Sequence, residues 1–259
     1  MKICFIGTCA ADYSPLLNTT LRQQLDKDAR RSSAVLVDEH LLVDCGHHVV
    51  ESLNIQNFPL ANIDVLLLTH LHDDHYQPDN IKRIADSADR KLQVYAHRSA
   101  LKRLKKELAD CNVEIHVLDY CKSRKLKCGM TVTGLPANHT SCPIHYLLES
   151  DHKSFYYATD GAWIMYDALY YLTDKKLDVV VLDATVGDYE GDFRVAEHNS
   201  IPMIRLMLKS FEKCQVCDEH TRIILSHIAP SLHKKHDETV KLLSDEGMEV
   251  AYDGWTITI

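Results

Sequence analysis

A six-residue segment, His70-Leu71-His72-Asp73-Asp74-His75, constrains this chain more than any other part of its sequence. It directly follows an apolar run, 65–69, that has the length and composition of a buried strand. Imidazole and carboxylate groups are ligands for divalent metals, and the segment holds four well-spaced ones. Side chains alternate along a strand, so His70 and His72 can point the same way, and a turn then brings Asp74 and His75 to a neighbouring point. One segment can thus supply two ligands to each of two metals.

The alternative interpretation of this segment is a polar turn that is rich in histidine by chance. The density of metal-binding residue types disfavours it. The whole chain has 16 histidines in 259 residues, and their positions carry more information than their number.

The overall composition is that of a globular protein. Hydrophobic residues make up 46% of the chain and charged residues 25%, with a net charge of −8. This acidic balance argues against nucleic acid as the main partner, because such binding relies on Lys and Arg to neutralise phosphates. It does not exclude a small phosphorylated substrate, because bound dications would set the local field.

The sequence also predicts where the protein resides. No apolar run approaches the roughly 20 residues that span a bilayer, and the first residues suggest a buried strand rather than a signal peptide. The nine cysteines are an odd number and are scattered, as expected for reduced thiols. We therefore expect a cytoplasmic protein with no membrane partner.

Apolar stretches predict two strand-rich halves that also carry helices. In the first half we expect strands at 2–6, 33–37, 41–44, 65–69 and 93–96, and helices at 79–88 and 98–110. In the second half we expect strands at 113–118, 131–137, 144–149, 154–158, 179–183, 222–226, 248–252 and 255–259, and helices at 162–173, 198–213 and 235–246. The pattern predicts an α/β fold in which two sheets pack face to face with helices outside, a four-layer αββα sandwich. No linker or repeat interrupts the chain, so residues 1–259 are expected to form a single domain.

Four more candidate residues lie elsewhere along the chain, one before the six-residue segment and three after it. Asp44 ends an early strand, His139 lies in Ala137-Asn138-His139-Thr140, Asp160 lies in Tyr157-Ala158-Thr159-Asp160-Gly161, and His227 lies in Leu225-Ser226-His227-Ile228. His139 or His227 alone would be weak support for a metal site. Together with the six-residue motif, the ordered set resembles the metallo-β-lactamase superfamily over nearly the whole chain.

The resemblance implies a ligand set for two divalent ions. His70, His72 and His139 would hold the first ion. Asp74, His75 and His227 would hold the second, Asp160 would bridge the two, and Asp44 would orient the motif without binding metal. Two such ions would generate a bridging hydroxide near neutral pH, which makes the chain a metal-dependent hydrolase with Asp74 also counted as catalytic. Ligands without thiolate suit zinc or manganese, and also iron.

Within the superfamily, the chain is most similar to the phosphodiesterase branch, which includes the tRNA 3′-processing endonuclease and phosphoribosyl cyclic-phosphate phosphodiesterase. The similarity lies in Gly7-Thr8, in Arg31-Ser32-Ser33-Ala34 and in Glu197-His198-Asn199-Ser200-Ile201. It implies that His198 is a catalytic histidine that protonates the leaving alkoxide or binds a phosphate oxygen. The alternative is that His198 simply begins a helix near the surface. The flavodiiron branch usually has Glu at the position of His72, so an oxidoreductase is disfavoured.

The predicted substrate is a small phosphate ester, a class that includes cyclic esters. The chain has no glycine-rich basic insertion like the tRNA-gripping arm of the endonuclease, and residues 9–31 hold only Cys9 where the cyclic-phosphate enzyme has a cysteine-rich zinc site. A lactone or thioester hydrolase remains the alternative. A tRNA-processing endonuclease and a non-catalytic scaffold are both less favoured, the scaffold because every expected ligand is present.

Several residues stay without a firm role at this level. His233 is a candidate for substrate binding, because relatives often place a histidine shortly after the last ligand. His47 and His48 can face the site or not, and His236 can line it or begin the last helix. Cys214 and Cys217 have the spacing of half a zinc knuckle, but no second half lies nearby, which favours a loop. The helices after residues 79 and 198 are candidates for a homodimer interface.

Overall fold

The computed structural model describes residues 1–140, 143–190 and 192–259. The chain divides into two compact units, the first formed by residues 1–119 and 252–258 and the second by residues 120–251 with residue 259. Within the described residues each unit is built on one seven-stranded sheet. None of the helices in these ranges is long and apolar enough to cross a membrane.

The sheet of the first unit has the strand order β14-β1-β2-β3-β4-β5-β6. Its strands are β1 (Lys2–Gly7), β2 (Ala34–Val37), β3 (Leu41–Val43), β4 (Val65–Leu67), β5 (Leu92–Ala96), β6 (Val113–Val117) and β14 (Thr256–Thr258). The strands from β3 to β6 are parallel, whereas β14, β1, β2 and β3 pair antiparallel in succession. The carboxyl ends of β3 and β4 therefore meet at one edge of the sheet, where Asp44 and His70 follow them.

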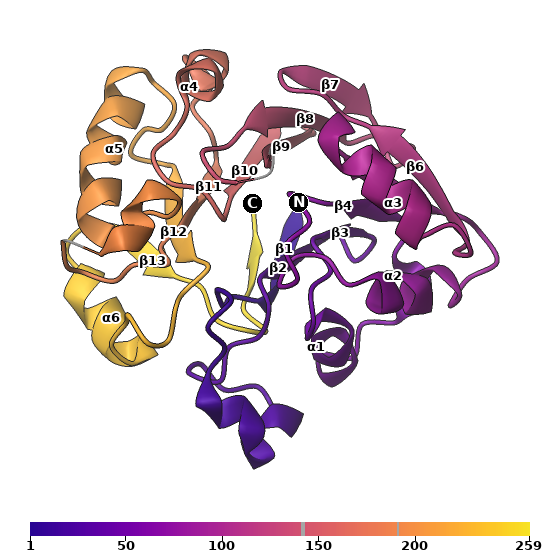
Figure 1. Ribbon diagram of the computed structural model, residues 1–259. Coiled ribbons are helices and arrows are strands. Elements are labelled where there is room, and N and C mark those ends of the chain that lie inside the picture. The colour runs from indigo at the N-terminus through magenta and orange to yellow at the C-terminus, as the bar shows by residue number, and fades with distance from the viewer. Residues whose placement is uncertain (141–142, 191) are drawn as a thin grey trace. The chain divides into compact units, whose positions relative to one another are not determined.

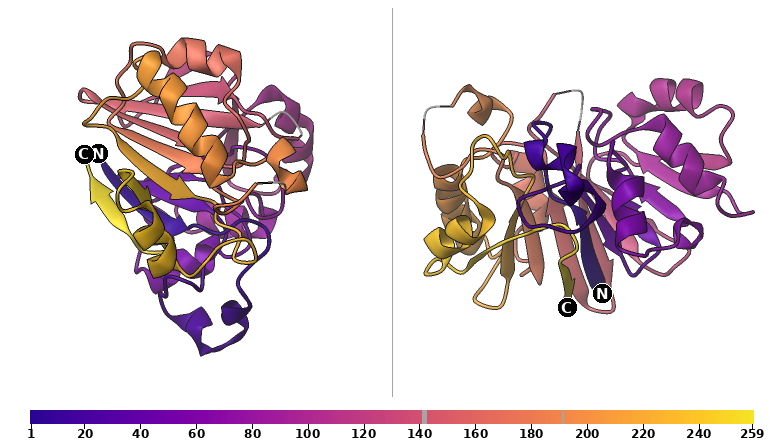
Figure 2. Two further views of the ribbon diagram at one scale, coloured as in Figure 1. Left: turned by 90° about the vertical axis from the view of Figure 1, so that its left-hand side faces the viewer. Right: turned by 90° about the horizontal axis from the view of Figure 1, so that it is seen from below.

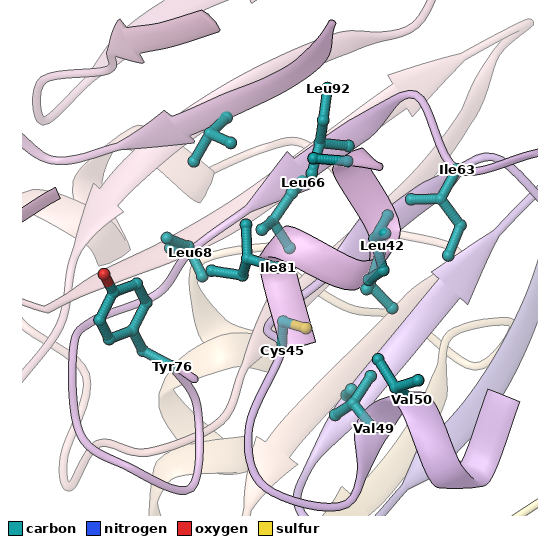
Figure 3. Packing of buried hydrophobic residues seen from close by; sticks show 14 of the residues in the cluster. Leu42, Cys45, Val49, Val50, Ile63, Leu66, Leu68, Tyr76, Ile81 and Leu92 are labelled. Carbon is teal, nitrogen blue, oxygen red and sulfur yellow. The ribbon is translucent and has the colours of Figure 1, made fainter. Parts of the chain in front are cut away.

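Three helices cover one face of this sheet, α1 (Val49–Ile55), α2 (Pro78–Ala85) and α3 (Leu101–Glu107) (Figure 1). Short 3₁₀ turns occur at η1 (Pro15–Asn18), η2 (Thr20–Gln23), η3 (Leu60–Asn62) and η4 (Arg98–Ala100). Ile81 of α2 is fully buried and lies against Leu66 of β4 and against Leu68, which follows β4 on the way to His70 (Figure 3). This packing anchors the segment that carries the candidate ligands.

The sheet of the second unit has the order β13-β12-β11-β10-β9-β8-β7. Its strands are β7 (Lys122–Lys125), β8 (Thr131–Pro136), β9 (Ile144–Ser150), β10 (Lys153–Ala158), β11 (Val179–Asp183), β12 (Arg222–Ser226) and β13 (Met248–Val250). The strands from β10 to β13 are parallel, and those from β7 to β10 are antiparallel. The parallel part again brings several strand ends to one edge.

The helical elements of the second unit are α4 (Tyr166–Leu172), η5 (Phe193–Ala196), α5 (Ile201–Lys213) and α6 (His236–Leu243). The longest, α5, lies across the sheet (Figure 2). It begins where the Ser200 side chain accepts a hydrogen bond from the Met203 backbone N–H. Its buried residues Ile201, Ile204, Met207 and Phe211 recur at three- and four-residue spacing and pack on the sheet.

The predicted α/β class with two sheets and flanking helices is confirmed, with differences in the assignment of strands. Residues 113–118 and 255–259 were expected in the second half, yet β6 and β14 belong to the sheet of the first unit. The last strand returns to pair with the first, with Thr258 opposite Lys2. The sequence did not predict β7, whose four residues are all exposed and lack the apolar alternation of a half-buried strand. The single domain over 1–259 stays a prediction.

The core beneath the metal-binding segment can be tested by removing one side chain. Ile81→Ala should lower the free energy of unfolding by about 2–5 kcal/mol, because it leaves a cavity between α2 and the sheet. The matched control is Lys82→Ala, which removes only the exposed ion pair with Asp86 and should cost at most about 0.5 kcal/mol. Denaturant unfolding of both variants measures the difference, and equal losses would contradict this account of the core.

Candidate metal centre

Asp44 is the structural centre of the candidate ligands in the first unit. It directly follows β3, is fully buried, and has a backbone φ of 65°, in the left-handed region that non-glycine residues rarely adopt. Its carboxylate accepts a hydrogen bond from the Thr69 backbone N–H at 2.8 Å and another from the Thr69 hydroxyl at 2.8 Å. The same carboxylate lies 2.7 Å from Nδ1 of His75.

The bond to Asp44 selects one tautomer of His75. An ionised carboxylate can only accept, so Nδ1 carries the proton and donates it, and Nε2 keeps a lone pair for a metal. Asp74 lies on that side, with its Oδ2 3.3 Å from Nε2 of His75. The Thr69 hydroxyl donates to Asp44 and lies 3.1 Å from Nδ1 of His70, where it can accept. His70 and His75 are therefore oriented so that each would bind a metal ion through its Nε2 atom.

The loop that carries these ligands is held by contacts between imidazole rings and by close backbone contacts. The ring of His70 lies 4.4 Å, centroid to centroid, from the rings of both His72 and His75. The carbonyl of His75 accepts a hydrogen bond from the Cys45 N–H at 2.8 Å. A Cβ at Gly46 would lie 1.7 Å from the carbonyl oxygen of Asp74, so only glycine permits this close approach.

The second unit places its candidate residues at the ends of three neighbouring parallel strands. Asp160 follows β10, Asp183 is the last residue of β11, and His227 follows β12. All three are buried. Asp160 and His227 have φ values of 59° and 56°. Left-handed backbone at non-glycine residues is uncommon and concentrates at functional sites.

Asp183 organises this half of the site. Its carboxylate accepts hydrogen bonds from the backbone N–H groups of Gly161, Thr185 and Asn199. It also lies 2.9 Å from Nδ1 of His198. Burial alone would raise the pKa of Asp183, but the charge and hydrogen bond of His198 and the nearby imidazole of His227 hold that pKa well below its usual range. Asp183 therefore stays ionised.

Asp183 reaches His227 through a hydroxyl group. Thr185 Oγ1 lies 3.2 Å from Asp183 Oδ2 and 2.7 Å from Nδ1 of His227. The hydroxyl donates to the carboxylate and accepts from the imidazole, so the proton of His227 is on Nδ1 and the lone pair is on Nε2. The first unit contains the same sequence of carboxylate, hydroxyl and imidazole, formed by Asp44, Thr69 and His70.

His139 and His198 both contact the carboxylate of Asp160. Nε2 of His139 is 3.3 Å from Asp160 Oδ1, and Nδ1 of His198 is 3.2 Å from the same oxygen. Ligand atoms of Asp160, Asp183, His198 and His227 all fall within 4.8 Å of one another. Burial lowers the pKa of His198, but Asp183 and Asp160 more than offset this, so the pKa is raised overall.

The sequence matches a known protein family over most of its length. A family model described as the β-lactamase superfamily domain matches residues 39–228. The chain belongs to the metallo-β-lactamase superfamily. The matched region contains all seven predicted metal ligands.

Solved structures show the same fold. Zinc-bound PqqB from Methylobacterium extorquens superposes with a TM-score of 0.78 at 15% identity, covering 100% of both chains. A diphosphatase of the PhnP family gives a TM-score of 0.75 at 19% identity, covering 99% of this chain and 96% of its own. At these identities the likeness establishes the metallo-β-lactamase fold.

A curated relative matches only part of the chain. The anti-Pycsar protein Apyc1 of Bacillus phage 010DV004 is 32% identical over 75 residues, which cover 29% of this chain. The match spans 25% of the relative's own length.

The superfamily predicted from the sequence is thus confirmed, and the individual metal-ligand roles stay predictions. Within each unit the structure brings together the residues expected there: His70, His72, Asp74 and His75 with Asp44 in the first, and His139, Asp160 and His227 with His198 in the second.

Three site residues were missed by the sequence interpretation, namely Thr69, Asp183 and Thr185. Asp183 had a usable signal, since it ends an apolar strand as Asp44 does. The threonines had none, because a hydroxyl beside a ligand is recognised only from its contacts.

The residues left without a role at the sequence level are also placed. His233 donates from Nε2 to the carbonyl of Ala184 at 2.6 Å, one residue from Asp183. His48 lies 3.1 Å from the Ser32 hydroxyl, and burial lowers the pKa of His48 to about 4, whereas His47 is exposed.

The remaining residues have structural positions. His236 is buried and begins α6. Cys214 caps the end of α5, and Cys217 packs in the core.

The role of Asp44 can be tested by an isosteric change. In Asp44→Asn the amide NH₂ group can face the Nδ1–H of His75, so the tautomer that binds metal is no longer enforced. We expect zinc affinity to fall by about 10–100-fold, measured by competition with a chelating dye. Asp38→Asn, in the exposed turn between β2 and β3, is the control. Unchanged affinity in a folded Asp44→Asn protein would refute the role.

Proposed function

We propose that this chain is a dinuclear metal-dependent phosphodiesterase that hydrolyses a small phosphate ester, cyclic esters included. The observation that carries the proposal is His198, held by Asp183 and lying next to Asp160. It supplies a positioned imidazole that metal ligation does not require. Membership of a metal-dependent hydrolase superfamily supplies the reaction class.

The donor groups of both units fit divalent ions. Nitrogen and carboxylate donors without thiolate suit zinc, manganese or iron. The hydrogen bonds of Asp44 and Thr185 leave Nε2 lone pairs on His75 and His227, as ligation needs. We infer that the first ion is held by His70, His72 and His139, the second by Asp74, His75 and His227, and that Asp160 bridges them. Two such ions, when bound, supply a nucleophile from water at neutral pH and neutralise charge on the substrate oxygens.

His198 is assigned the remaining chemical task. Its Nδ1–H is engaged by Asp183 at 2.9 Å, which fixes the ring and leaves Nε2 for the substrate. A protonated Nε2 can donate to the oxygen of the departing alkoxide or to a phosphate oxygen. Asp183 acts through His198 and His227 and is therefore a positioning residue.

The size and charge of the substrate follow from the chain as a whole. The net charge of −8 disfavours a long nucleic acid. The likeness to a diphosphatase of the PhnP family supports a phosphate-containing substrate. A cytoplasmic location and a homodimer are part of the same proposal.

A lactone or thioester hydrolase is the second candidate, because two metal ions would serve acyl transfer equally well. The position of His198 favours the phosphodiesterase over a thioester hydrolase, since a departing alkoxide needs a proton donor more than a thiolate does. The likeness to a diphosphatase of the PhnP family supports it over a lactone hydrolase.

The first test is a substrate panel with metal-quantified protein. Protein loaded with two equivalents of zinc or manganese should hydrolyse bis(p-nitrophenyl) phosphate, lose activity with chelator, and regain it with one of the metals. A lactone and a thioester serve as the comparison. Turnover of only these carboxylic substrates by protein with two bound metals would move the function to the second candidate.

The role of His198 can be separated from metal binding. His198→Ala should lower kcat about 10²–10⁴-fold for an alkyl diester, within the range for loss of a general acid. The loss should be smaller for a p-nitrophenyl ester, because that leaving group needs little protonation. Metal content should not change, and His220→Ala, at a side chain 85% exposed, is the control. Equal losses for both esters would mean that His198 binds phosphate rather than donating a proton.

A further inference from the structure

The second unit contains a cavity of about 120 Å³ that the metal ligands do not line. It lies between the loop after β11, the start of α5, residues 232–234 and α6. Its walls include Tyr189, Ile201, Leu232, His233, Lys234 and Leu242. One water molecule needs roughly 10–15 Å³ of such space, so the cavity has room for a ring-sized group.

The cavity wall is attached to the scaffold of the candidate metal centre. His233 lines the cavity and donates from Nε2 to the carbonyl of Ala184 at 2.6 Å. Ala184 lies between Asp183 and Thr185, which hold His198 and His227. A Cβ at Gly187 would lie 2.2 Å from the Leu232 carbonyl oxygen, so these two segments are in close backbone contact. A group in the cavity would therefore be fixed relative to His198.

The chemistry of the walls favours a particular kind of ligand group. Ile201, Leu232 and Leu242 are apolar, and Tyr189 adds an aromatic ring. The one carboxylate among the lining residues, Asp188, is bound by the Arg205 guanidinium, which offsets its charge. Lys234 is exposed and supplies a cation on the lining. The lining thus mixes apolar side chains with polar ones, His233 and Thr239 among them, and such a wall suits a small organic group that has a nonpolar face and a hydrogen-bonding edge.

We propose that this cavity binds the retained group of the phosphate ester, the part that stays attached to phosphate after the leaving group departs. The occupant is a ring-sized organic group with a nonpolar face and a hydrogen-bonding edge. The inference rests on the proposed phosphodiesterase function and adds the site that selects the substrate. It assigns His233 as a wall of that site, in contact with the scaffold of the reacting centre.

The experiment compares two esters that share one leaving group. Bis(p-nitrophenyl) phosphate retains a nitrophenyl group, and methyl p-nitrophenyl phosphate retains only methyl. Leu242→Trp and Leu232→Trp each place a large side chain at the cavity. Leu206→Trp, at a side chain 55% exposed on α5 and not on the lining, is the matched control.

The expected result is selective for the larger ester. In metal-loaded protein, the filling variants should raise KM for the bis-nitrophenyl ester about tenfold or more, the scale on which a filled pocket rejects a group. KM for the methyl ester should change less than twofold, and Leu206→Trp should match the wild type for both. If Leu242→Trp and Leu232→Trp had the KM of the wild type for the bis-nitrophenyl ester, or raised KM equally for both esters, the cavity assignment alone would be overturned. Failure of the wild type to turn over either ester would overturn the phosphodiesterase function and this inference with it.

Discussion

A buried carboxylate that fixes the tautomer of a histidine is the interaction on which this structure depends. Asp44 receives the Nδ1–H of His75 directly, and Asp183 reaches His227 through the Thr185 hydroxyl. In both cases Nε2 is left with its lone pair, the atom through which a metal would be bound. The same Asp183 also holds His198, so one carboxylate positions a proposed ligand and the proposed proton donor.

The backbone is shaped to allow these bonds. Asp44, Asp160 and His227 all adopt positive φ directly after or within two residues of a strand end. Such conformations cost free energy and persist only where the surrounding structure compensates. Parallel strands packed under helices provide that support, because they bring several chain reversals to one edge of each sheet. The cavity near Ala184 uses the same edge of the second sheet.

Sequence patterns predicted the elements whose burial is simple. The run 65–69 was expected as a strand leading to His70, and α5 was expected from its apolar spacing. The exposed edge strand β7 was missed because its residues Lys122–Lys125 have no buried face to reveal a period. The last strand was assigned to the wrong half, since its pairing with β1 is a contact between residues more than 250 positions apart. Apolar periodicity reports burial and carries no information about which strand is the neighbour.

The sequence by itself determined the superfamily and the candidate ligands, because ligand chemistry depends on residue type, and the spacing of His70, His72, Asp74 and His75 is local. Only the tertiary structure decided how those ligands are oriented. Asp183 and Thr185 are distant from His227 along the chain, and their role arises because β11 and β12 are adjacent parallel strands. A hydrogen bond that fixes a tautomer requires atoms within about 3 Å of each other, and such distances are set by folding rather than by sequence spacing.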